Sequence, residues 1–204
     1  MTSSLLRAVF HKSAEKLSQL PVESRVEVAF AGRSNAGKSS ALNALTGRRK
    51  LAHVSKTPGR TRLINFFEID PGAYLVDLPG YGYAQVSADM KRQWSRLLTG
   101  YLNERRQIRG LVVVMDVRHP MTPLDRQLLD WFSATGRPVH VLLTKADKLS
   151  RSQIAVQLRK AQAVLRKDYP GCTAQIFSSS TKQGLEEAQH IISNWLAAEP
   201  GDGQ

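Results

Sequence analysis

Short apolar runs alternate with longer amphipathic stretches along this chain. Runs typical of buried central strands occupy residues 26–31, 111–115 and 139–143, and residues 173–177 form a plausible last strand. Helix-forming stretches cover residues 38–46, 88–104, 123–135, 150–168 and 185–197. This alternation predicts an α/β fold, in which helices cover both faces of one sheet.

Two further strand-like segments, residues 62–69 and 74–76, are separated only by Asp70-Pro71-Gly72-Ala73. A connection that short joins antiparallel neighbours. We therefore predict a mostly parallel six-stranded sheet with one antiparallel edge strand. With 204 residues and no internal repeat, the chain fits one domain over residues 22–198, with a leading segment 1–21 and a flexible tail 199–204.

A phosphate-binding loop is predicted between the first apolar run and the first helix. The sequence there matches G-x-x-x-x-G-K-[ST] in full, as Gly32-Arg33-Ser34-Asn35-Ala36-Gly37-Lys38-Ser39. Glycines allow the backbone to wrap closely around a phosphate, so that several N–H groups point at its oxygens. We expect Lys38 to reach the β- and γ-phosphates and Ser39 to offer its hydroxyl to Mg²⁺.

A second motif, Asp77-Leu78-Pro79-Gly80, follows a predicted strand. Asp77 can hold a Mg²⁺-bound water, and the N–H of Gly80 can donate to the γ-phosphate. The polar segment between the motifs contains Thr57 and Thr61. We prefer Thr61 as the threonine that ligates Mg²⁺ when a γ-phosphate draws the segment inwards, because it adjoins the next strand.

The base is expected to be guanine because of Thr144-Lys145-Ala146-Asp147. Asp147 can accept from both donors of the guanine edge, whereas adenine would leave this carboxylate unpaired. The stem of Lys145 can lie along the base. Thr144 replaces the asparagine of the usual N-K-x-D pattern, so we expect the phosphate loop to lose an amide brace. The segment from Ser178 to Lys182 either donates backbone N–H groups to the guanine carbonyl or caps the following helix.

The charge balance adds a partner class. There are 29 Lys and Arg against 17 Asp and Glu, a net charge of +12 and a pI near 10.2. Such a field favours nucleic acid first and anionic membrane second. One basic group surrounds the nucleotide motifs and comprises Arg48, Arg49, Lys50, His53, Lys56, Arg60, Arg62, Arg118 and His119. A second group lies at a helix end and comprises Arg105, Arg106 and Arg109. The alternative is a solvated basic face.

Aromatic residues divide between two interpretations. Tyr81 and Tyr83 are candidates for stacking on RNA bases, whereas Phe66 and Phe67 fit better as hairpin core. Trp94, Trp131 and Trp195 have helical spacing that indicates packing.

Cysteine content and hydropathy indicate a compartment. Cys172 is the sole cysteine, which suits a reducing cytoplasm, and no apolar run has the length that spans a bilayer. The first residues fit a plain leading segment better than a secretory or transit peptide. We therefore expect a cytoplasmic protein.

Taken together, these motifs resemble one family of GTPases. Five segments carry the resemblance: G-R-S-N-A-G-K-S-S, K-T-P-G-R-T, N-F-F, V-D-L-P-G-Y-G-Y-A and L-L-T-K-A-D-K-L. Over about residues 22–198, the chain is similar to the EngB (YsxC/YihA) GTPases of ribosome biogenesis. The resemblance implies a Ras-like P-loop fold and hydrolysis of GTP to GDP with Mg²⁺. It also implies a part in cell division, with the large ribosomal subunit or its precursor as partner. Nothing in the sequence demands a dimer, so we expect a monomer.

Carried over by position, the resemblance implies a full set of site residues. The nucleotide would be lined by Gly32, Arg33, Ser34, Asn35, Ala36, Gly37, Lys38, Ser39, Gly59, Arg60, Thr61, Arg62, Leu63, Asp77, Leu78, Pro79, Gly80, Thr144, Lys145, Ala146, Asp147, Phe177, Ser178 and Ser179. Ser39 and Thr61 become the Mg²⁺ ligands, and Lys38, Asn35, Thr61 and Gly80 the catalytic set.

Two residues bear on the rate of hydrolysis. Tyr81 stands where many GTPases have a glutamine that orients the attacking water, so we expect slow hydrolysis by the free protein. Asn35 is a candidate ligand of an activating K⁺ beside the β–γ bridge, although it also fits an ordinary loop turn. A small regulatory GTPase with a protein or membrane effector, and no ribosomal role, stays open as the second interpretation.

Overall fold

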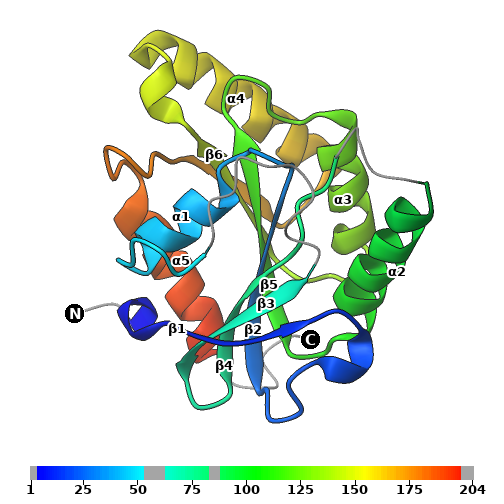
Figure 1. The fold of residues 1–204 in the computed structure, drawn as a ribbon. Helices are drawn as coiled ribbons and strands as arrows, with labels where there is room; N and C mark the ends of the chain where they lie inside the picture. The colour runs from blue at the N-terminus through cyan, green and yellow to red at the C-terminus, as the bar shows by residue number, and fades with distance from the viewer. Residues whose placement is uncertain (1–3, 53–62, 83–87, 199–204) are drawn as a thin grey trace.

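One sheet runs through the molecule, with seven strands among the described residues in the order β1-β3-β4-β2-β5-β6-β7 (Figure 1). The computed structural model describes residues 4–52, 63–82 and 88–198. The strands are β1 Val9–Ala14, β2 Val26–Gly32, β3 Ile64–Asp70, β4 Ala73–Asp77, β5 Ile108–Asp116, β6 Val139–Thr144 and β7 Cys172–Ile176. Each predicted strand is present, with ends that differ by at most three residues.

The strand directions confirm the α/β class and correct two details. β2 is parallel to β4 and β5, and β5, β6 and β7 are parallel to one another. β3 is antiparallel to both β4 and β1. The predicted six strands are therefore seven, and the antiparallel strand of the hairpin is second from the edge. The edge itself is β1, from the segment expected only to lead into the domain.

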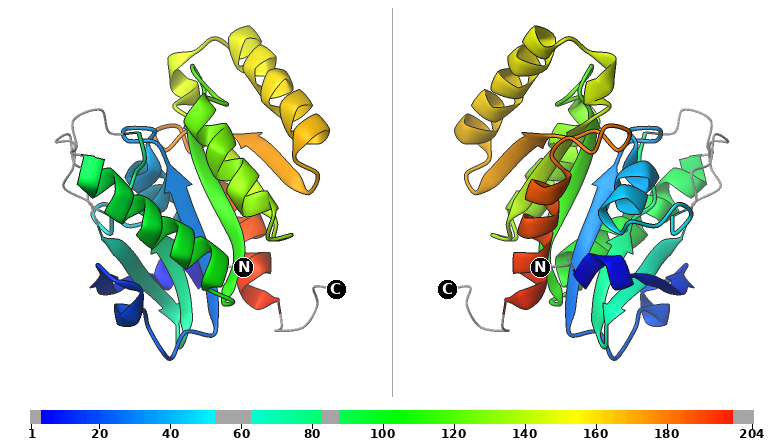
Figure 2. Two further views of the ribbon diagram at one scale, coloured as in Figure 1. Left: turned by 90° about the vertical axis from the view of Figure 1, so that its right-hand side faces the viewer. Right: turned by 90° about the vertical axis from the view of Figure 1, so that its left-hand side faces the viewer.

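Five α-helices among the described residues cover both faces of the sheet (Figure 2). They are α1 Lys38–Leu45, α2 Ala88–Glu104, α3 Pro123–Ser133, α4 Arg151–Asp168 and α5 Leu185–Ala197. Short 3₁₀ turns occupy η1 Ser4–Arg7, η2 Leu17–Gln19 and η3 Ala146–Lys148. The residues of α2, α3 and α4 share one apolar cluster with the sheet, and those of η1, α1 and α5 share the other.

The central strands contribute to both clusters in alternation. In β2, Ala29 and Ala31 face the α2–α4 side, and Val28 and Phe30 face the α1–α5 side. All four are fully buried. Because both faces of a parallel sheet are covered by helices, its central strands read as continuous apolar runs rather than alternating ones.

The tryptophans behave differently from one another. The ring of Trp195 on α5 lies against Gly110 of β5, so closely that a Cβ at that glycine would be 2.4 Å from the ring. Trp131 on α3 is 38% exposed, which corrects the prediction that it packs inside. The side chain of Trp94 lies outside the described residues.

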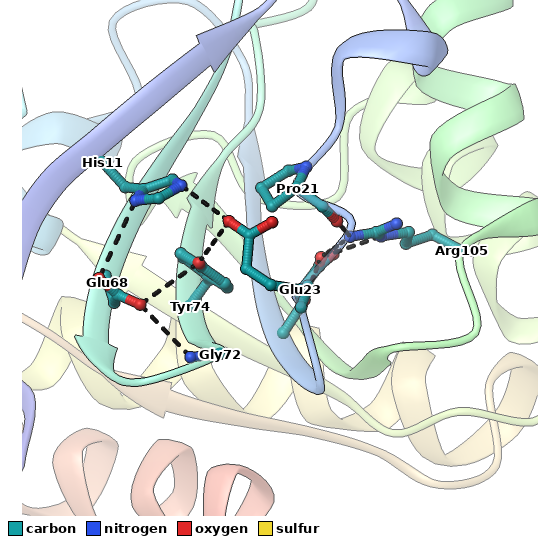
Figure 3. Close-up of polar contacts among 9 residues, drawn as sticks. His11, Pro21, Glu23, Glu68, Gly72, Tyr74 and Arg105 are labelled. Carbon is teal, nitrogen blue, oxygen red and sulfur yellow. Dashed lines mark hydrogen bonds and ion pairs between the residues drawn. The ribbon is translucent and has the colours of Figure 1, made fainter.

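Polar contacts fix β1 on the sheet (Figure 3). The pairing with β3 shifts between Phe10 and Lys12, so that His11 is an extra residue in a bulge. His11 Nε2 lies 3.0 Å from Glu23, and Nδ1 lies 3.9 Å from Glu68. The hydroxyl of Tyr74 lies within 3.3 Å of both carboxylates. One cluster therefore joins β1, β3, β4 and the loop before β2.

None of the helices in the described parts of the chain is long and apolar enough to cross a bilayer.

Candidate functional site

The predicted motifs meet at one end of the sheet. β2, β4, β5 and β6 are parallel, and they end at Gly32, Asp77, Asp116 and Thr144 respectively. In the register, Gly32 lies beside Val114, and Asp116 beside Thr144. The carboxyl edge of a parallel sheet is where α/β proteins bind ligands. The fold thus brings together residues that are more than a hundred positions apart.

The loop between β2 and α1 has the backbone shape that its glycines suggested. Asn35 and Gly37 have φ angles of 63° and 100°, and Gly37 is the N-cap of α1. The N–H of Ala36 donates to the Arg33 carbonyl at 3.0 Å, which closes the turn. The first turn of a helix has N–H groups without intrahelical acceptors, so the loop and α1 together can hold an anion.

Thr144 braces this loop, contrary to the expectation that the brace would be lost. Its buried hydroxyl lies 2.5 Å from the Ala36 carbonyl and 3.0 Å from the Met115 carbonyl. A hydroxyl can donate to a carbonyl as an amide does, and the shorter side chain fits because Gly37 passes close by. A Cβ on Gly37 would lie 3.4 Å from the Thr144 hydroxyl.

Lys145 also contacts the loop. Its ammonium donates to the Asn35 carbonyl at 2.6 Å and lies 2.9 Å from Asp116. The residue has a φ of 61°, an unusual conformation for a side chain of this size. Both contacts hold the ammonium, so the end of the Lys145 side chain is fixed beside the loop.

Asp116 is a site residue that the sequence motifs did not indicate. It accepts from the Nε and Nη2 of Arg118, at 2.9 and 2.6 Å, and from Lys145. Burial alone raises the pKa of Asp116, but the hydrogen bonds from Arg118 and Lys145 outweigh it and hold the pKa well below its usual range. The available signal was its position, because it ends a strand that neighbours the strand of Thr144.

Asp147 lies in η3 as an ionised acceptor. Ser178 donates to its Oδ1 at 2.7 Å, and Lys148 lies 3.2 Å from its Oδ2. The bond from Ser178 lowers the pKa of Asp147, and Lys148 adds to this effect. The N–H of Ser178 itself donates to the Gln183 carbonyl at 3.0 Å. Ser178 thus acts on Asp147 through its side chain, and Ala146 is tied to the Phe177 carbonyl by its N–H.

Lys38 and Asp77 form a buried ion pair between α1 and β4. The ammonium of Lys38 donates to Asp77 Oδ1, and the two residues are 8% and 3% exposed. Ser39 follows Lys38 directly on α1. A hydroxyl and a carboxylate are oxygen donors of the class that Mg²⁺ takes, so these residues fit the expected ion.

Tyr81 points away from the phosphate loop, while its backbone stays beside that loop. Its N–H donates to the Gly32 carbonyl at 3.2 Å, and its carbonyl accepts from Ser34 at 2.9 Å. The buried hydroxyl donates to Asp125 of α3 at 2.8 Å. Burial, reinforced by the Asp125 charge, raises the pKa of Tyr81 well above its usual range. Stacking of Tyr81 on RNA is therefore excluded in this conformation, whereas Phe66 and Phe67 are core residues as predicted.

The predicted basic residues differ in how exposed they are. Arg48, Arg49, Lys50, Arg118 and His119 are exposed. Arg105 is not a free surface charge: it donates to Glu27 and to the Pro21 carbonyl, and its side chain is 14% exposed.

Several predicted site residues lie outside the described residues. These are His53, Lys56, Thr57, Gly59, Arg60, Thr61, Arg62 and Tyr83. Their assignment stays a prediction, and with it the role of Thr61 as a metal ligand.

Comparison with known proteins gives one consistent result. Residues 27–145, more than half of the chain, match the family described as 50S ribosome-binding GTPase. The probable GTP-binding protein EngB of Methylobacillus flagellatus is 54% identical over 195 residues, which cover 96% of this chain and 94% of the relative. That of Thiobacillus denitrificans is 57% identical over 195 residues, with the same coverage.

Solved structures agree on the fold. A crystal structure of a probable GTP-binding protein EngB superposes with a TM-score of 0.65 at 22% identity, over 84% of this chain and 98% of that one. Era, in complex with MgGDPNP and nucleotides 1506–1542 of 16S ribosomal RNA, superposes with a TM-score of 0.66 at 23% identity, over 87% and 59%. These likenesses confirm a Ras-like GTPase fold. The match to the family model and the relatives at 54% and 57% identity show that the chain belongs to the EngB family of GTP-binding GTPases.

Proposed function

We propose that this protein is a slow, guanine-specific GTPase that acts as a nucleotide-dependent switch in assembly of the large ribosomal subunit. The observation that carries the proposal is the arrangement of Asp147 and Lys145. The ionised carboxylate of Asp147 is held by Ser178, and two residues earlier the ammonium of Lys145 donates to the phosphate-type loop.

Guanine specificity follows from the acceptors of Asp147. Both oxygens keep lone pairs after bonding Ser178 and Lys148. Guanine offers two donors on the edge that faces such a carboxylate, and adenine offers no matching pair. A site built to accept hydrogen bonds from one base rejects a base that leaves its acceptor unpaired.

For the phosphates, Lys38 is the principal cation. Its pairing with Asp77 keeps the ammonium beside the loop, from where it can exchange to a phosphate oxygen. Ser39, with Thr61 of the undescribed segment, would ligate Mg²⁺, and Asp77 would hold one of its bound waters. When bound, Mg²⁺ supplies charge neutralisation at the β- and γ-phosphates.

Slow hydrolysis follows from Tyr81, since its hydroxyl donates to Asp125 and a phenol lacks the carboxamide that orients water. Additional charge at the β–γ bridge would raise the rate, and the exposed Asn35 is the candidate ligand of K⁺ there. Single-turnover hydrolysis should therefore be at least several-fold faster in KCl than in NaCl, because a bound K⁺ would stabilise the charge that develops at the β–γ bridge. Equal rates in the two salts would remove K⁺ from the proposal.

A ribosomal partner is supported by charge and by family. The chain has a net charge of +12, and exposed Arg48, Arg49 and Lys50 lie two residues beyond the end of α1. Such residues bind RNA phosphates in a salt-dependent way. The family description names the 50S subunit, and Era has been solved with ribosomal RNA.

Co-sedimentation with purified ribosomal subunits tests the proposal. The protein should pellet with large-subunit particles in a non-hydrolysable GTP analogue and largely dissociate in GDP. A salt series should weaken the binding steeply, because each phosphate contact releases counterions. Binding that ignores the nucleotide, or appears only on anionic vesicles, would favour a regulatory GTPase with another effector.

A further inference from the structure

A series of charged contacts joins the protein surface to the nucleotide site outside the motif residues already discussed. Arg118 holds the carboxylate of Asp116, the same carboxylate holds Lys145, and Lys145 donates to the Asn35 carbonyl of the phosphate loop. The Arg118 side chain is 45% exposed, and that of Asp116 only 17%. Three contacts therefore lead from solvent to the loop.

Asp116 is shared between two cations. Its Oδ2 accepts from Arg118 Nη2 at 2.6 Å and from Lys145 at 2.9 Å. Its Oδ1 accepts from Arg118 Nε at 2.9 Å and from the Arg118 backbone N–H at 3.0 Å. Two cations on one carboxylate repel each other, so each weakens the hold on the other.

Removal of the guanidinium would leave Asp116 well oriented. The backbone N–H of Arg118 stays bonded to Oδ1, and the N–H of His119 donates to the Asp116 carbonyl, which keeps the turn closed. The carboxylate would then bind Lys145 alone. A partner that draws Arg118 outward would thus tighten the clamp on Lys145 rather than release it.

We propose that Arg118 is a sensor for an RNA backbone phosphate, which takes the guanidinium and thereby slows release of the bound guanine nucleotide. The inference rests on the proposed function, because it takes Lys145 to lie along the guanine base. Coupling between two binding events is reciprocal, so the nucleotide-loaded protein also binds RNA more tightly than the empty protein does.

Phosphate is the ligand that fits this position. A guanidinium binds a phosphate through two parallel N–H bonds, in the same geometry that it uses here for Asp116. The exposed His119 lies next to it in the turn, and the whole chain has a net charge of +12. The coupling concerns the base site, which GDP and GTP fill alike, so it reports occupancy and not the γ-phosphate.

Release of a fluorescent GDP derivative from the full chain tests this inference, with and without a single-stranded RNA oligonucleotide at low salt. RNA should slow release from the wild type about fivefold, within the usual range of coupling between sites. Arg118→Ala should abolish the effect of RNA and should release GDP no faster than the wild type. Arg159→Ala removes an exposed arginine from α4 and should respond to RNA as the wild type does.

Asp116 is a positioning residue in this scheme. Asp116→Asn should release GDP roughly tenfold faster, with no response to RNA, as expected for loss of one charge-assisted contact. Asp116→Glu should restore part of both properties, a rescue that a merely structural role would not give.

Two results would overturn the inference: RNA that leaves wild-type release unchanged, or an Arg118→Ala protein that still responds. In the first case, slowing by anionic vesicles would identify a membrane surface as the partner instead. The experiment uses GDP alone, so it can succeed where the GTP-dependent co-sedimentation fails. Absence of any GDP binding would count against the proposed function itself.

Discussion

A single hydroxyl, that of Thr144, connects the phosphate loop to two neighbouring strands. It ends β6, reaches the Met115 carbonyl of β5 and reaches the Ala36 carbonyl of the loop. Because Thr144 is 2% exposed, these carbonyls have no ready access to water in its place. The shape of the loop therefore depends on a residue that is distant from it in sequence.

Replacement of this hydroxyl by a methyl group is expected to loosen the loop. Thr144→Val keeps the side-chain volume but leaves a buried carbonyl unpaired. The lost hydrogen bond should weaken the free energy of GDP binding by about 1 kcal/mol, which is about fivefold in affinity. Titration calorimetry measures the change. Thr144→Ser keeps the hydroxyl and is the matched control; an equal loss in both variants would attribute the effect to packing.

At this scale, the sequence predicted residues whose spacing fixes their role. Lys38 and Asp147 belong to motifs with defined positions, and the structure puts both at the carboxyl edge of the parallel strands. The contacts between motifs were not predictable. Asp116 belongs to no motif, and its bonds to Arg118 and Lys145 depend on which strands are neighbours. The rotation of Tyr81 toward Asp125 also depends on the position of α3, which spacing does not give.

Between elements, β6 and β7 are joined by a buried histidine. His140 Nε2 lies 2.8 Å from the Gln175 Oε1, and Nδ1 lies 2.7 Å from the Thr173 hydroxyl. Gln175 donates in turn to the Gly184 carbonyl at 2.6 Å, which directs its Oε1 toward the ring. The neutral ring thus donates from Nε2 and accepts at Nδ1.

This histidine should make the fold sensitive to mild acid. Burial lowers the pKa of His140, so the unfolded chain takes up a proton that the folded chain resists. Stability is therefore lost as pH falls below the ordinary histidine value, by up to about 1.4 kcal/mol at pH 5.5. Urea unfolding of the wild type and of His140→Gln at pH 7.5 and 5.5 measures this difference.

His140→Gln should show a smaller loss between the two pH values. The exposed His190 on α5 provides the control, since His190→Gln should follow the wild type. Identical pH dependence in all three proteins would show that His140 does not contribute.

The elements with a strong apolar pattern were predicted from the sequence, whereas β1, which has no such pattern, was not. The five helices and the six other strands have a run of apolar positions or a helical stripe. In β1, the first three residues are exposed and only Ala14 is buried, so alternation is absent. Its place is fixed by the free edge of β3 and by His11, which are features of the assembled sheet.

At the scale of the whole molecule, the buried carboxylate of Glu27 binds residues from distant parts of the chain. Glu27 at the start of β2 accepts from Ser24, from Tyr101 of α2 and from Arg105 beyond α2. Arg105 also donates to the Pro21 carbonyl at 2.6 Å. The segment before β2 is thereby tied to the end of α2, on the side of the sheet opposite α1.

Loss of the Glu27 charge should destabilise the protein without weakening nucleotide binding. Glu27→Gln leaves the guanidinium of Arg105 buried without a counter-charge, which typically costs about 3 kcal/mol. Urea unfolding at pH 7 measures the free energy of unfolding, and GDP titration checks the site at the other end of β2. Glu104→Gln, an exposed change at the end of α2, is the control. A loss under about 1 kcal/mol would contradict the assigned role.

The pairing of β1 with β3 also has a consequence for the order of folding. Arg7, just before the strand, pairs with Asp70, 63 residues later in the chain, and Ser13 bonds Asn65, 52 residues later. During synthesis the first strand must therefore wait for the hairpin, for roughly 3–13 s at typical elongation rates. Phe10, 57% exposed even in the finished fold, is available to chaperones or to other chains throughout that interval.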